Sequence, residues 1–213
     1  MPTPGLLMRL VQPLQGQTPS NEALSPSNVS PNIDAIYRLT RTDDKSPEYN
    51  TTYFLNDITP LVEDESFYKK DQDKFKTSLE SITWVLVSYI NGHPFTHSSV
   101  PPSPPPLGTE IVMNGSSPKP EYEADYHNWY DQEHVGKLGA VPGWQLMRRY
   151  KFEKVYGEVE TASFYGVNFY DEKNGLGGPE WKASATDWTL RIRQQAAKPN
   201  VRRTWKLVGI DDV

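Results

Sequence analysis

The side chains with the clearest chemical capacity lie between Asp125 and Lys151, in the run DYHNWYDQEHVGKLGAVPGWQLMRRYK. This run holds His127 and His134, two of the four histidines, together with Tyr130. A histidine with a pKa near ~6.5 can take up or release a proton near neutral pH. A phenol can donate a hydrogen bond to a developing enolate. The run therefore predicts proton-transfer chemistry, with these three side chains as candidate catalytic residues.

Their spacing predicts one shared helix face. At 100° per residue, His127, Tyr130 and His134 fall within ~80° of one another, and Tyr126 lies next to Tyr130. Such a face would point into a cavity between a helix and a sheet. Structural roles stay open: His134 bonded to a backbone carbonyl or to Glu133, His127 exposed near the helix start, and Tyr130 in the core.

Substrate-binding residues are expected around the same cavity. Arg148 and Arg149 alternate along a predicted strand, so only one of them is expected to face inward. The inward guanidinium could bind a carboxylate, although exposure is an equal alternative. For the tryptophans, a place in the core is the competing interpretation. The candidate substrate-binding residues are Tyr126, Trp129, Arg148, Tyr165 and Trp188.

The sequence predicts neither a metal site nor a cofactor. His127 and His134 are seven residues apart, which differs from the i, i+4 spacing of helical metal ligands. There is no cysteine, which excludes a disulfide, a thiolate zinc site and a thiol nucleophile. No dinucleotide fingerprint, phosphate-binding loop or nucleophile elbow is present, and the run NGLGGP at 174–179 reads as a turn or a lid.

Composition narrows the class of partner. The 213 residues carry a formal net charge of −5 without a basic run, which argues against nucleic acid. No apolar run approaches the ~20 residues of a membrane span. The start, MPTPGLLMRLVQPL, is too broken by proline for a signal peptide. We expect a soluble cytoplasmic protein whose partner is a small hydrophobic molecule.

The order of expected elements repeats once along the chain. Strands are predicted at 5–14, 33–41, 51–58 and 82–91, and again at 109–114, 144–153, 162–170 and 201–210. In the first half, residues 15–31 are broken by proline and predict a loop with at most one helical turn. A helix is predicted from Thr59 as N-cap, with Leu61, Tyr68, Phe75 and Leu79 on one face.

In the second half, one helix is predicted to end near Leu138. Another is predicted to carry the stripe Trp181, Ala185, Trp188, Ile192 and Ala196.

This order predicts an α+β fold. Each half reads as the βαββαβ pattern of the ferredoxin-like fold. Because the strands are apolar on both faces, the second face of each sheet must also be covered. We therefore expect two tandem ferredoxin-like βαββαβ modules packed sheet-to-sheet as an intrachain dimeric α/β barrel. The first module is 1–92 with a degenerate first helix, 93–108 is a proline-rich linker, and 109–213 is the second module with the candidate site.

The run from Asp125 to Lys151 resembles the dimeric α/β-barrel superfamily, and in particular the EthD-like tandem-module proteins of filamentous fungi. The shared motif is an aromatic pair, then Glu-His, a Pro-Gly turn and an Arg-rich strand. The chain departs from it at Gly136, where the family has proline, and in 18–31, which lacks the first module's histidine helix. The motif is carried here by Trp129-Tyr130, Glu133-His134, Val141-Pro142-Gly143-Trp144 and Arg148-Arg149-Tyr150.

The resemblance implies one working cavity, in the C-terminal half. It implies a cofactor-independent enzyme of secondary metabolism that cyclises, isomerises or decarboxylates a hydrophobic, polyketide-like molecule by proton transfer. The alternative is a non-catalytic small-molecule binding or accessory protein that uses the same cavity. Haem-binding relatives exist in the superfamily, so a haem ligand stays a minor alternative. The expected assembly is a monomer with an internal pseudo-dimer, or a homodimer.

Overall fold

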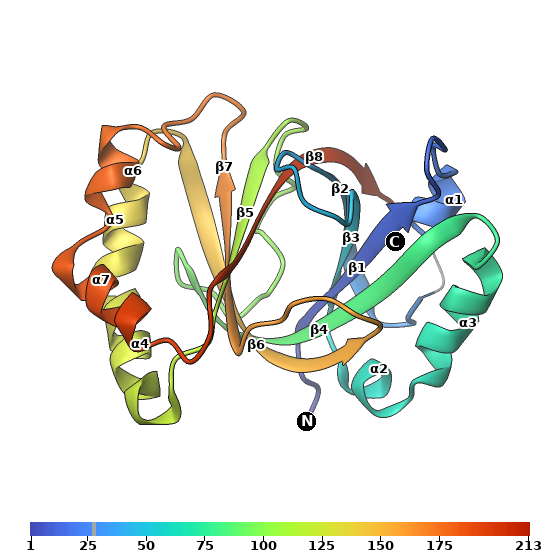
Figure 1. Ribbon diagram of the computed structural model, residues 1–213, viewed down its shortest axis with the longest axis horizontal. Helices are drawn as coiled ribbons and strands as arrows, with labels where there is room; N and C mark the ends of the chain where they lie inside the picture. Colours follow the sequence, from blue (N-terminus) through green and yellow to red (C-terminus); the bar gives the residue numbers. More distant parts are fainter. Residues whose placement is uncertain (27–28) are drawn as a thin grey trace.

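A closed barrel of eight antiparallel strands forms the centre of the molecule (Figure 1). The structure is a computed structural model that describes residues 1–26 and 29–213. Going round the barrel, the strands follow the order β1-β3-β2-β8-β5-β7-β6-β4. Helices α1, α2 and α3 lie outside the barrel at one end of the long axis, and α4 to α7 lie at the other. The predicted α+β class is confirmed.

Eight strands build the wall, close to the predicted positions. They are β1 (Gly5–Pro13), β2 (Ile33–Arg41), β3 (Tyr49–Leu55), β4 (Leu79–His93), β5 (Glu110–Ser116), β6 (Trp144–Tyr156), β7 (Phe164–Tyr170) and β8 (Val201–Asp211).

The helices are short, and several follow one another directly. They are α1 (Asn21–Leu24), α2 (Thr59–Glu63), α3 (Ser66–Phe75), η1 (Pro120–Tyr122), α4 (Glu123–Trp129), η2 (Tyr130–His134), α5 (Val135–Gly139), α6 (Pro179–Ala183) and α7 (Asp187–Gln194). No helix in the described ranges is both long and apolar enough to cross a membrane.

The two halves share one strand order. In each half the fourth strand pairs with the first, the first with the third, and the third with the second: β4-β1-β3-β2 and β8-β5-β7-β6. The halves meet along two seams, β2 with β8 and β4 with β6. Every strand therefore has two hydrogen-bonded neighbours, and the sheet has no free edge.

Alternation along β1 shows why both faces of the strands are apolar. Leu6, Met8 and Leu10 point into the barrel and belong to its interior core. Leu7 and Val11 point outward and pack under the helices of the first half. The prediction that β1 is covered on both sides is confirmed, because all five side chains are buried.

The helix predicted to start at Thr59-Pro60 does start there, but its N-cap is Ile58 and it is shorter than predicted. Thr59 is already helical, and its backbone N–H donates a hydrogen bond of 3.0 Å to the Asp57 carboxylate. The helix then breaks at Asp64, whose carboxylate accepts two hydrogen bonds of 2.8 Å from the N–H and hydroxyl of Ser66. These local hydrogen bonds compete with the backbone hydrogen bonds that would continue the helix. A second helix, α3, follows and ends at Phe75, so Leu79 begins β4 instead of extending the helix face.

The last predicted helix is also divided. Thr186 caps α7 by accepting a hydrogen bond of 3.1 Å from the Thr189 N–H, and its extended backbone separates α7 from α6. The expected stripe from Trp181 to Ala196 is therefore spread over two helices and the turns beside them. The single turn α1 agrees with the prediction for residues 15–31, of which 27–28 lie outside the described residues.

The linker covers one end of the barrel. Tyr89 donates a hydrogen bond of 2.8 Å to the carbonyl of Thr96, and Tyr150 donates one of 3.2 Å to the carbonyl of Ser99. Both tyrosines belong to strands of the barrel. The proline-rich segment thus packs on the barrel as well as connecting its halves.

Candidate functional site

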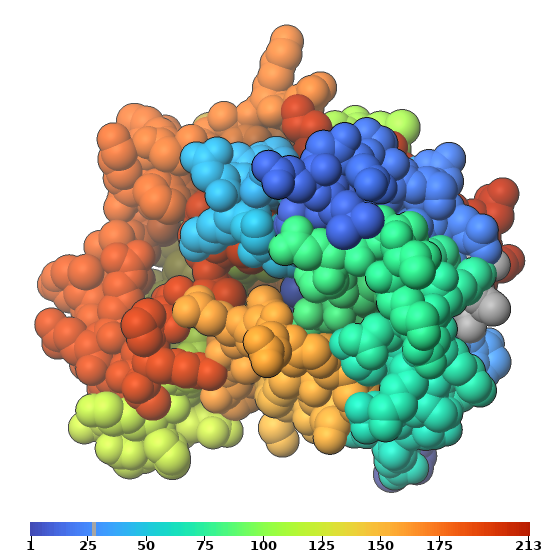
Figure 2. Space-filling model, turned by 45° about the vertical axis from the view of Figure 1, so that its right-hand side comes forward, coloured from blue at the N-terminus to red at the C-terminus, as the bar shows by residue number. Residues whose placement is uncertain are grey.

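A cleft of about 1220 Å³ lies between the helices of the second half and the outer face of the barrel. Its floor is formed by β5 and β8, through Asn114 and Arg202 among others, and its walls by η2, α6 and α7. Figure 2 shows the hollow between the orange-red helices and the rest of the molecule. The volume is somewhat above the ~300–1,000 Å³ of typical small-molecule sites.

Three of the predicted residues meet at this cleft: Trp129, Tyr130 and His134. The imidazole of His134 stacks on the Trp129 indole, with ring centroids 3.9 Å apart and planes inclined by 22°. The Tyr130 ring stands perpendicular to the same imidazole at 5.1 Å. Both aromatic rings are buried, so they hold the histidine in one orientation at the wall of the cleft.

His127 does not line the cleft, and a π-helical turn explains why. The turn from Tyr130 to His134 adds about one residue to the helical repeat, which shifts the later side chains by roughly 100°. His127 and His134 therefore do not share the face that regular helical spacing predicts. The expectation of two imidazoles in one cavity is wrong.

His127 instead belongs to a cluster with Arg149. The Arg149 guanidinium donates to Nδ1 of His127, and donates a hydrogen bond of 2.9 Å to Asp131. Because Nδ1 accepts, the neutral ring carries its proton on Nε2, which lies 3.8 Å from Glu123. Burial and the Arg149 charge lower the pKa of His127.

Arg148 and Arg149 are both buried, which corrects the prediction that one of them faces inward and the other is free to be exposed. They point to opposite faces of β6: Arg149 toward the helices, and Arg148 into the barrel. Arg148 therefore lies away from the cleft. Tyr165 is likewise inside the barrel, where its hydroxyl accepts a hydrogen bond of 2.9 Å from the Ala162 N–H.

Two further predicted residues pack beside the cleft without lining it. Tyr126 is buried against Phe164, with ring centroids 5.5 Å apart. Trp188 donates a hydrogen bond of 3.1 Å to Asp125 and ties α7 to α4. Tyr126 and Trp188 are therefore placed to hold the helices together and not to contact a ligand in the cleft.

The chemistry of His134 follows from its surroundings. Burial lowers its pKa to about 3, and the charges of Arg193 and Arg149 add to the effect. The Nδ1 atom is buried and has no hydrogen-bond partner among the described residues. Glu133, one of the two partners expected for a structural role, instead accepts a hydrogen bond of 2.5 Å from Thr186. The imidazole is therefore neutral at pH 7 and keeps a free nitrogen.

Tyr130 remains protonated for a related reason. Burial raises its pKa, and the Arg149 guanidinium, 4.3 Å from the centre of its ring, opposes part of that rise. The phenol hydroxyl lies against Gly166 of β7, where a β-carbon would collide with it. Tyr130 thus presents its ring, and not a reactive phenolate, to His134.

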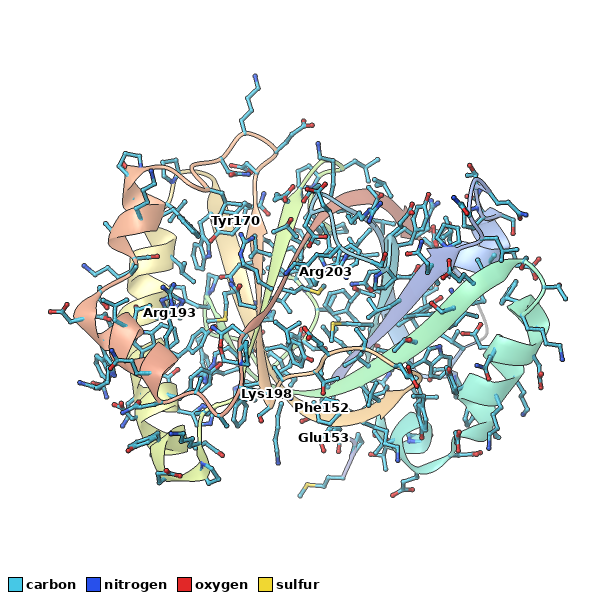
Figure 3. All side chains as sticks on the ribbon, in the orientation of Figure 1. Phe152, Glu153, Tyr170, Arg193, Lys198 and Arg203 are labelled. Carbon is cyan, nitrogen blue, oxygen red and sulfur yellow. The ribbon has the colours of Figure 1, made fainter. Side chains whose placement is uncertain are left out.

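The cleft is basic although the protein is acidic. Four cations line it, Lys182, Arg193, Lys198 and Arg202, and across residues 1–26 and 29–213 none of them has an ion-pair partner within 4.0 Å. The acid on the wall, Glu110, accepts a hydrogen bond from Thr42. Figure 3 marks Arg193 on α7 and Lys198 on the segment that follows. Such a surface attracts anions.

The sequence did not predict these cations as a group. They come from α6, α7, β8 and the segment between α7 and β8, so no spacing along the chain connects them. The resemblance to a known family directed attention to the histidine helix only. The one available signal was the absence of acidic residues between 188 and 209.

The equivalent space in the first half is filled. Arg9 of β1 pairs with Trp84 of β4, and both lie on the outer face under α3. The Arg9 guanidinium binds the Asp71 carboxylate through two hydrogen bonds of 2.7 and 2.9 Å, and the Trp84 indole donates a third of 2.8 Å. In the second half the paired residues are Asn114 and Arg202, which leave the cleft open.

The cleft offers few side chains that could bind a metal ion. Within the described part of the chain, no group of three His, Asp or Glu side chains is close enough to hold an ion. His134 is the one imidazole on the cleft wall.

Comparison with known proteins identifies the fold. No family model matches the chain, and no curated protein matches it in sequence. An anthrone oxidase-like protein superposes with a TM-score of 0.57 at 12% identity, over 98% of this chain and 93% of the other. A proposed monooxygenase from Fusobacterium nucleatum subsp. nucleatum gives a TM-score of 0.65 at 10% identity, over 99% and 95%. A proposed chlorite dismutase gives 0.61 at 13% identity, over 98% and 96%.

These likenesses agree with the dimeric α/β-barrel fold that the resemblance implied. At identities this low they concern the fold alone, so the likeness to EthD-like proteins stays a prediction.

Proposed function

We propose that this protein is an enzyme that removes a proton from a small, enolisable aromatic or polyketide-like molecule bound in the cleft. The observation that carries the proposal is the neutral imidazole of His134 on the wall of a cleft of about 1220 Å³. Tyr130 and Trp129 position the imidazole. Among the described residues that line the cleft, His134 is the one imidazole, so the role of the neutral base falls to it.

The proposed step is charge-balanced. A C–H proton next to a carbonyl group moves to His134, and the electron pair of that bond forms an enolate. The imidazolium and the enolate then attract each other, and the guanidinium groups of Arg193 and Arg202 stabilise the enolate oxygen. Because an anionic enolate offsets the two charges that lower the His134 pKa, the imidazole becomes a stronger base as the reaction proceeds.

The family resemblance implies cyclisation, isomerisation or decarboxylation without a cofactor, in secondary metabolism of a filamentous fungus. Two structural neighbours are described as anthrone oxidase-like and as a proposed monooxygenase, which adds oxidation. An anthrone is itself an enolisable polycyclic ketone, so cyclisation, isomerisation and oxidation can begin with the same proton transfer. Decarboxylation instead forms its enolate by loss of CO₂, and the proton transfer then follows.

Deuterium exchange tests that first step without knowledge of the fate. Anthrone in buffered D₂O should take up deuterium at its acidic carbon faster with the protein than without it. The variant His134→Ala should lose about 10²- to 10⁴-fold of the added rate. The matched control is His127→Ala, which removes a histidine of the same helix away from the cleft. Equal exchange with wild type and His134→Ala would contradict the proposed role.

A non-catalytic binding protein is the second candidate, and one observation favours it. A histidine with a pKa of about 3 is a weak base before a substrate binds. Anthrone that binds in the cleft without accelerated exchange would support this candidate.

We also propose that the repeated strand order reflects two ferredoxin-like modules in tandem, 1–92 and 109–213, joined by the linker 93–108. The two seams between the halves support this interpretation. They also support a monomer of 24.2 kDa with an internal pseudo-dimer. Light scattering tests the assembly; twice that mass would favour a homodimer.

A further inference from the structure

Two exposed arginines, Arg193 of α7 and Arg202 of β8, lie on the walls of the cleft. No carboxylate lies within 4.0 Å of either guanidinium among the described residues. Every other arginine that solvent reaches lies outside the cleft and forms an ion pair with a carboxylate. These paired arginines are Arg38, Arg41, Arg191 and Arg203. Within residues 1–26 and 29–213, accessible arginines without an ion pair therefore occur only in the cleft.

In the first half, the covering helix supplies an acid at the corresponding place. Asp71 of α3 lies eight residues before the start of β4, and its carboxylate binds the Arg9 guanidinium through hydrogen bonds of 2.7 and 2.9 Å. The residue eight positions before the start of β8 is Arg193. At this corresponding position α7 carries a cation, whereas α3 carries an acid.

The sheet under α7 carries a cation as well. Arg202 of β8 is paired with Asn114 of β5, and both line the cleft. The equivalent pair of the first half is Trp84 with Arg9, because Arg9 and Asn114 are each the fifth residue of their strand. Asp71 balances the charge of Arg9. The first half is thus neutral at this place, and the second half has two positive charges beside the cleft.

Two lysines and one acid complete the charges on the cleft walls. Lys182 and Lys198 are exposed, and Figure 3 marks Lys198 on the segment between α7 and β8. Glu110, the acid, accepts a hydrogen bond of 2.5 Å from Thr42. The two aromatic rings that hold His134 are buried. The charges therefore gather at the mouth of the cleft, and aromatic groups lie inside.

The number of cations indicates a ligand with more than one negative charge. A carboxylate carries a single charge, and one guanidinium can bind both of its oxygens. A phosphate monoester carries about −1.5 to −2 charges at pH 7 on three oxygens, so it can bind several cations at once. Arginine binds phosphate through its planar fork, and lysine binds it as a point charge. The cleft, at about 1220 Å³, has room for a phosphate group beside an aromatic ring system.

We propose that the cleft binds a molecule with a flat apolar end and a phosphate group, and that Arg202 and Lys198 bind the phosphate at the mouth. The apolar end reaches the wall formed by Trp129 and His134. Arg193 lies nearer the imidazole, since its charge lowers the pKa of His134, and it adds to the positive field. A guanidinium has five N–H donors, so Arg202 can bind phosphate oxygens and still face an enolate oxygen. The place of the apolar end rests on the function proposed for the cleft, whereas phosphate binding does not.

Three compounds with one ring system separate the contribution of charge. At pH ~7.5, 2-naphthyl phosphate, 2-naphthoate and 2-naphthol carry about two, one and no negative charges. Calorimetry on the full chain measures their affinities. The ¹H–¹⁵N indole signal of Trp181, assigned with Trp181→Phe, shows whether they enter the cleft. None of the three is a ketone with an acidic C–H bond, so a failure of phosphate binding is distinguishable from a failure of proton transfer.

We expect 2-naphthyl phosphate to shift the Trp181 signal and to bind about 10-fold more tightly than 2-naphthoate, with 2-naphthol the weakest. Raising the salt concentration from about 50 to about 300 mM should weaken binding of the phosphate ester and leave that of 2-naphthol unchanged. Inorganic phosphate should compete only at about 10-fold higher concentration or above, because it lacks the ring system.

The variant Arg202→Gln tests the assigned phosphate ligand. It should weaken binding of 2-naphthyl phosphate about 10-fold and leave that of 2-naphthol unchanged. The matched control is Arg191→Gln on α7, which removes an exposed guanidinium that is paired with Asp125 outside the lining of the cleft. This control should bind the phosphate ester as the wild-type protein does. The comparison of the three compounds on the wild-type protein stands by itself if Arg202→Gln fails to fold.

Several results would overturn the proposal. Equal affinity for 2-naphthyl phosphate and 2-naphthoate would mean that a single negative charge is sufficient, and equal affinity for the ester and 2-naphthol would remove charge from recognition. Inorganic phosphate that binds as tightly as the ester would remove the apolar end. Unchanged affinity of Arg202→Gln for the ester, binding without a shift of the Trp181 signal, or no binding at all would remove the phosphate from the mouth of the cleft.

Discussion

Arg148 and Arg149 are neighbours in β6, and both are buried, on opposite faces of the barrel wall. Arg149 donates to Asp131 at 2.9 Å and to His127, and lies over the ring of Tyr130. Arg148 donates only to the adjacent carbonyl of Met147, at 3.0 Å, and its Nε atom has no partner among the described residues. One guanidinium is therefore neutralised and the other is not.

This contrast predicts opposite effects of the same substitution. Arg149→Met should lower the free energy of unfolding by about 1.5–3 kcal/mol, because it removes hydrogen bonds of a charged group. Arg148→Met should leave that free energy unchanged or raise it, because a buried cation without a carboxylate is costly to desolvate. Urea unfolding of the two variants provides the comparison. An equal loss in both would mean that Arg148 has a counter-charge that the structure does not include.

The buried ion pair between Arg9 and Asp71 should contribute more to the free energy of unfolding than an exposed ion pair does. Asp71 accepts hydrogen bonds from Arg9 and Trp84, so Asp71→Ala leaves a buried guanidinium without its partner. We expect a loss of about 3–5 kcal/mol in the free energy of unfolding. The control is Glu65→Ala, which breaks an exposed ion pair with Lys69 and should cost less than about 1 kcal/mol. Losses of similar size in the two variants would contradict the assigned role of the buried pair.

Much of the barrel could be predicted from the sequence because its strands are apolar on both faces. Leu6 and Leu7 are adjacent and both buried, which is possible only when a strand has a core on each side. The helix breaks could not be predicted in the same way. Asp64 fits a helix by composition, and only its bonds to Ser66 show that the chain turns there.

The candidate site was predictable in part, because helical spacing places some of its side chains on one face. Tyr130 and His134 follow from helical spacing, and the structure brings them together with Trp129. The π-helical turn that separates His127 from them has no signal in residue type. Arg193 and Arg202 converge through tertiary packing, which spacing along the chain does not describe.

The contact between Tyr130 and Gly166 offers a test of how tightly the site is packed. A β-carbon at Gly166 would collide with the Tyr130 hydroxyl, so Gly166→Ala should destabilise the protein by about 1–3 kcal/mol. The double variant Gly166→Ala/Tyr130→Phe should recover part of that loss, because it removes the colliding oxygen. Thermal unfolding of the single and double variants checks this coupling. Strictly additive losses would show that the alanine is accommodated elsewhere.

The low pKa of His134 predicts a specific dependence of stability on pH. In the unfolded chain this imidazole has a pKa of ~6.5, and in the folded protein burial and two guanidinium groups lower it to about 3. Below pH ~6.5 the unfolded chain therefore binds a proton that the folded protein does not. The stability due to the neutral imidazole is complete above that pH and falls as the pH drops toward 3.

His134→Gln lacks the titrating group, so the difference in unfolding free energy between wild type and this variant should shrink or reverse on acidification. The ring signals of His134 should remain unchanged between pH 8 and 5 in NMR spectra, and should titrate when the chain is unfolded in urea. A midpoint near pH 6 in the folded protein would mean that the imidazole is hydrated, and would weaken its assignment as the neutral base of the cleft.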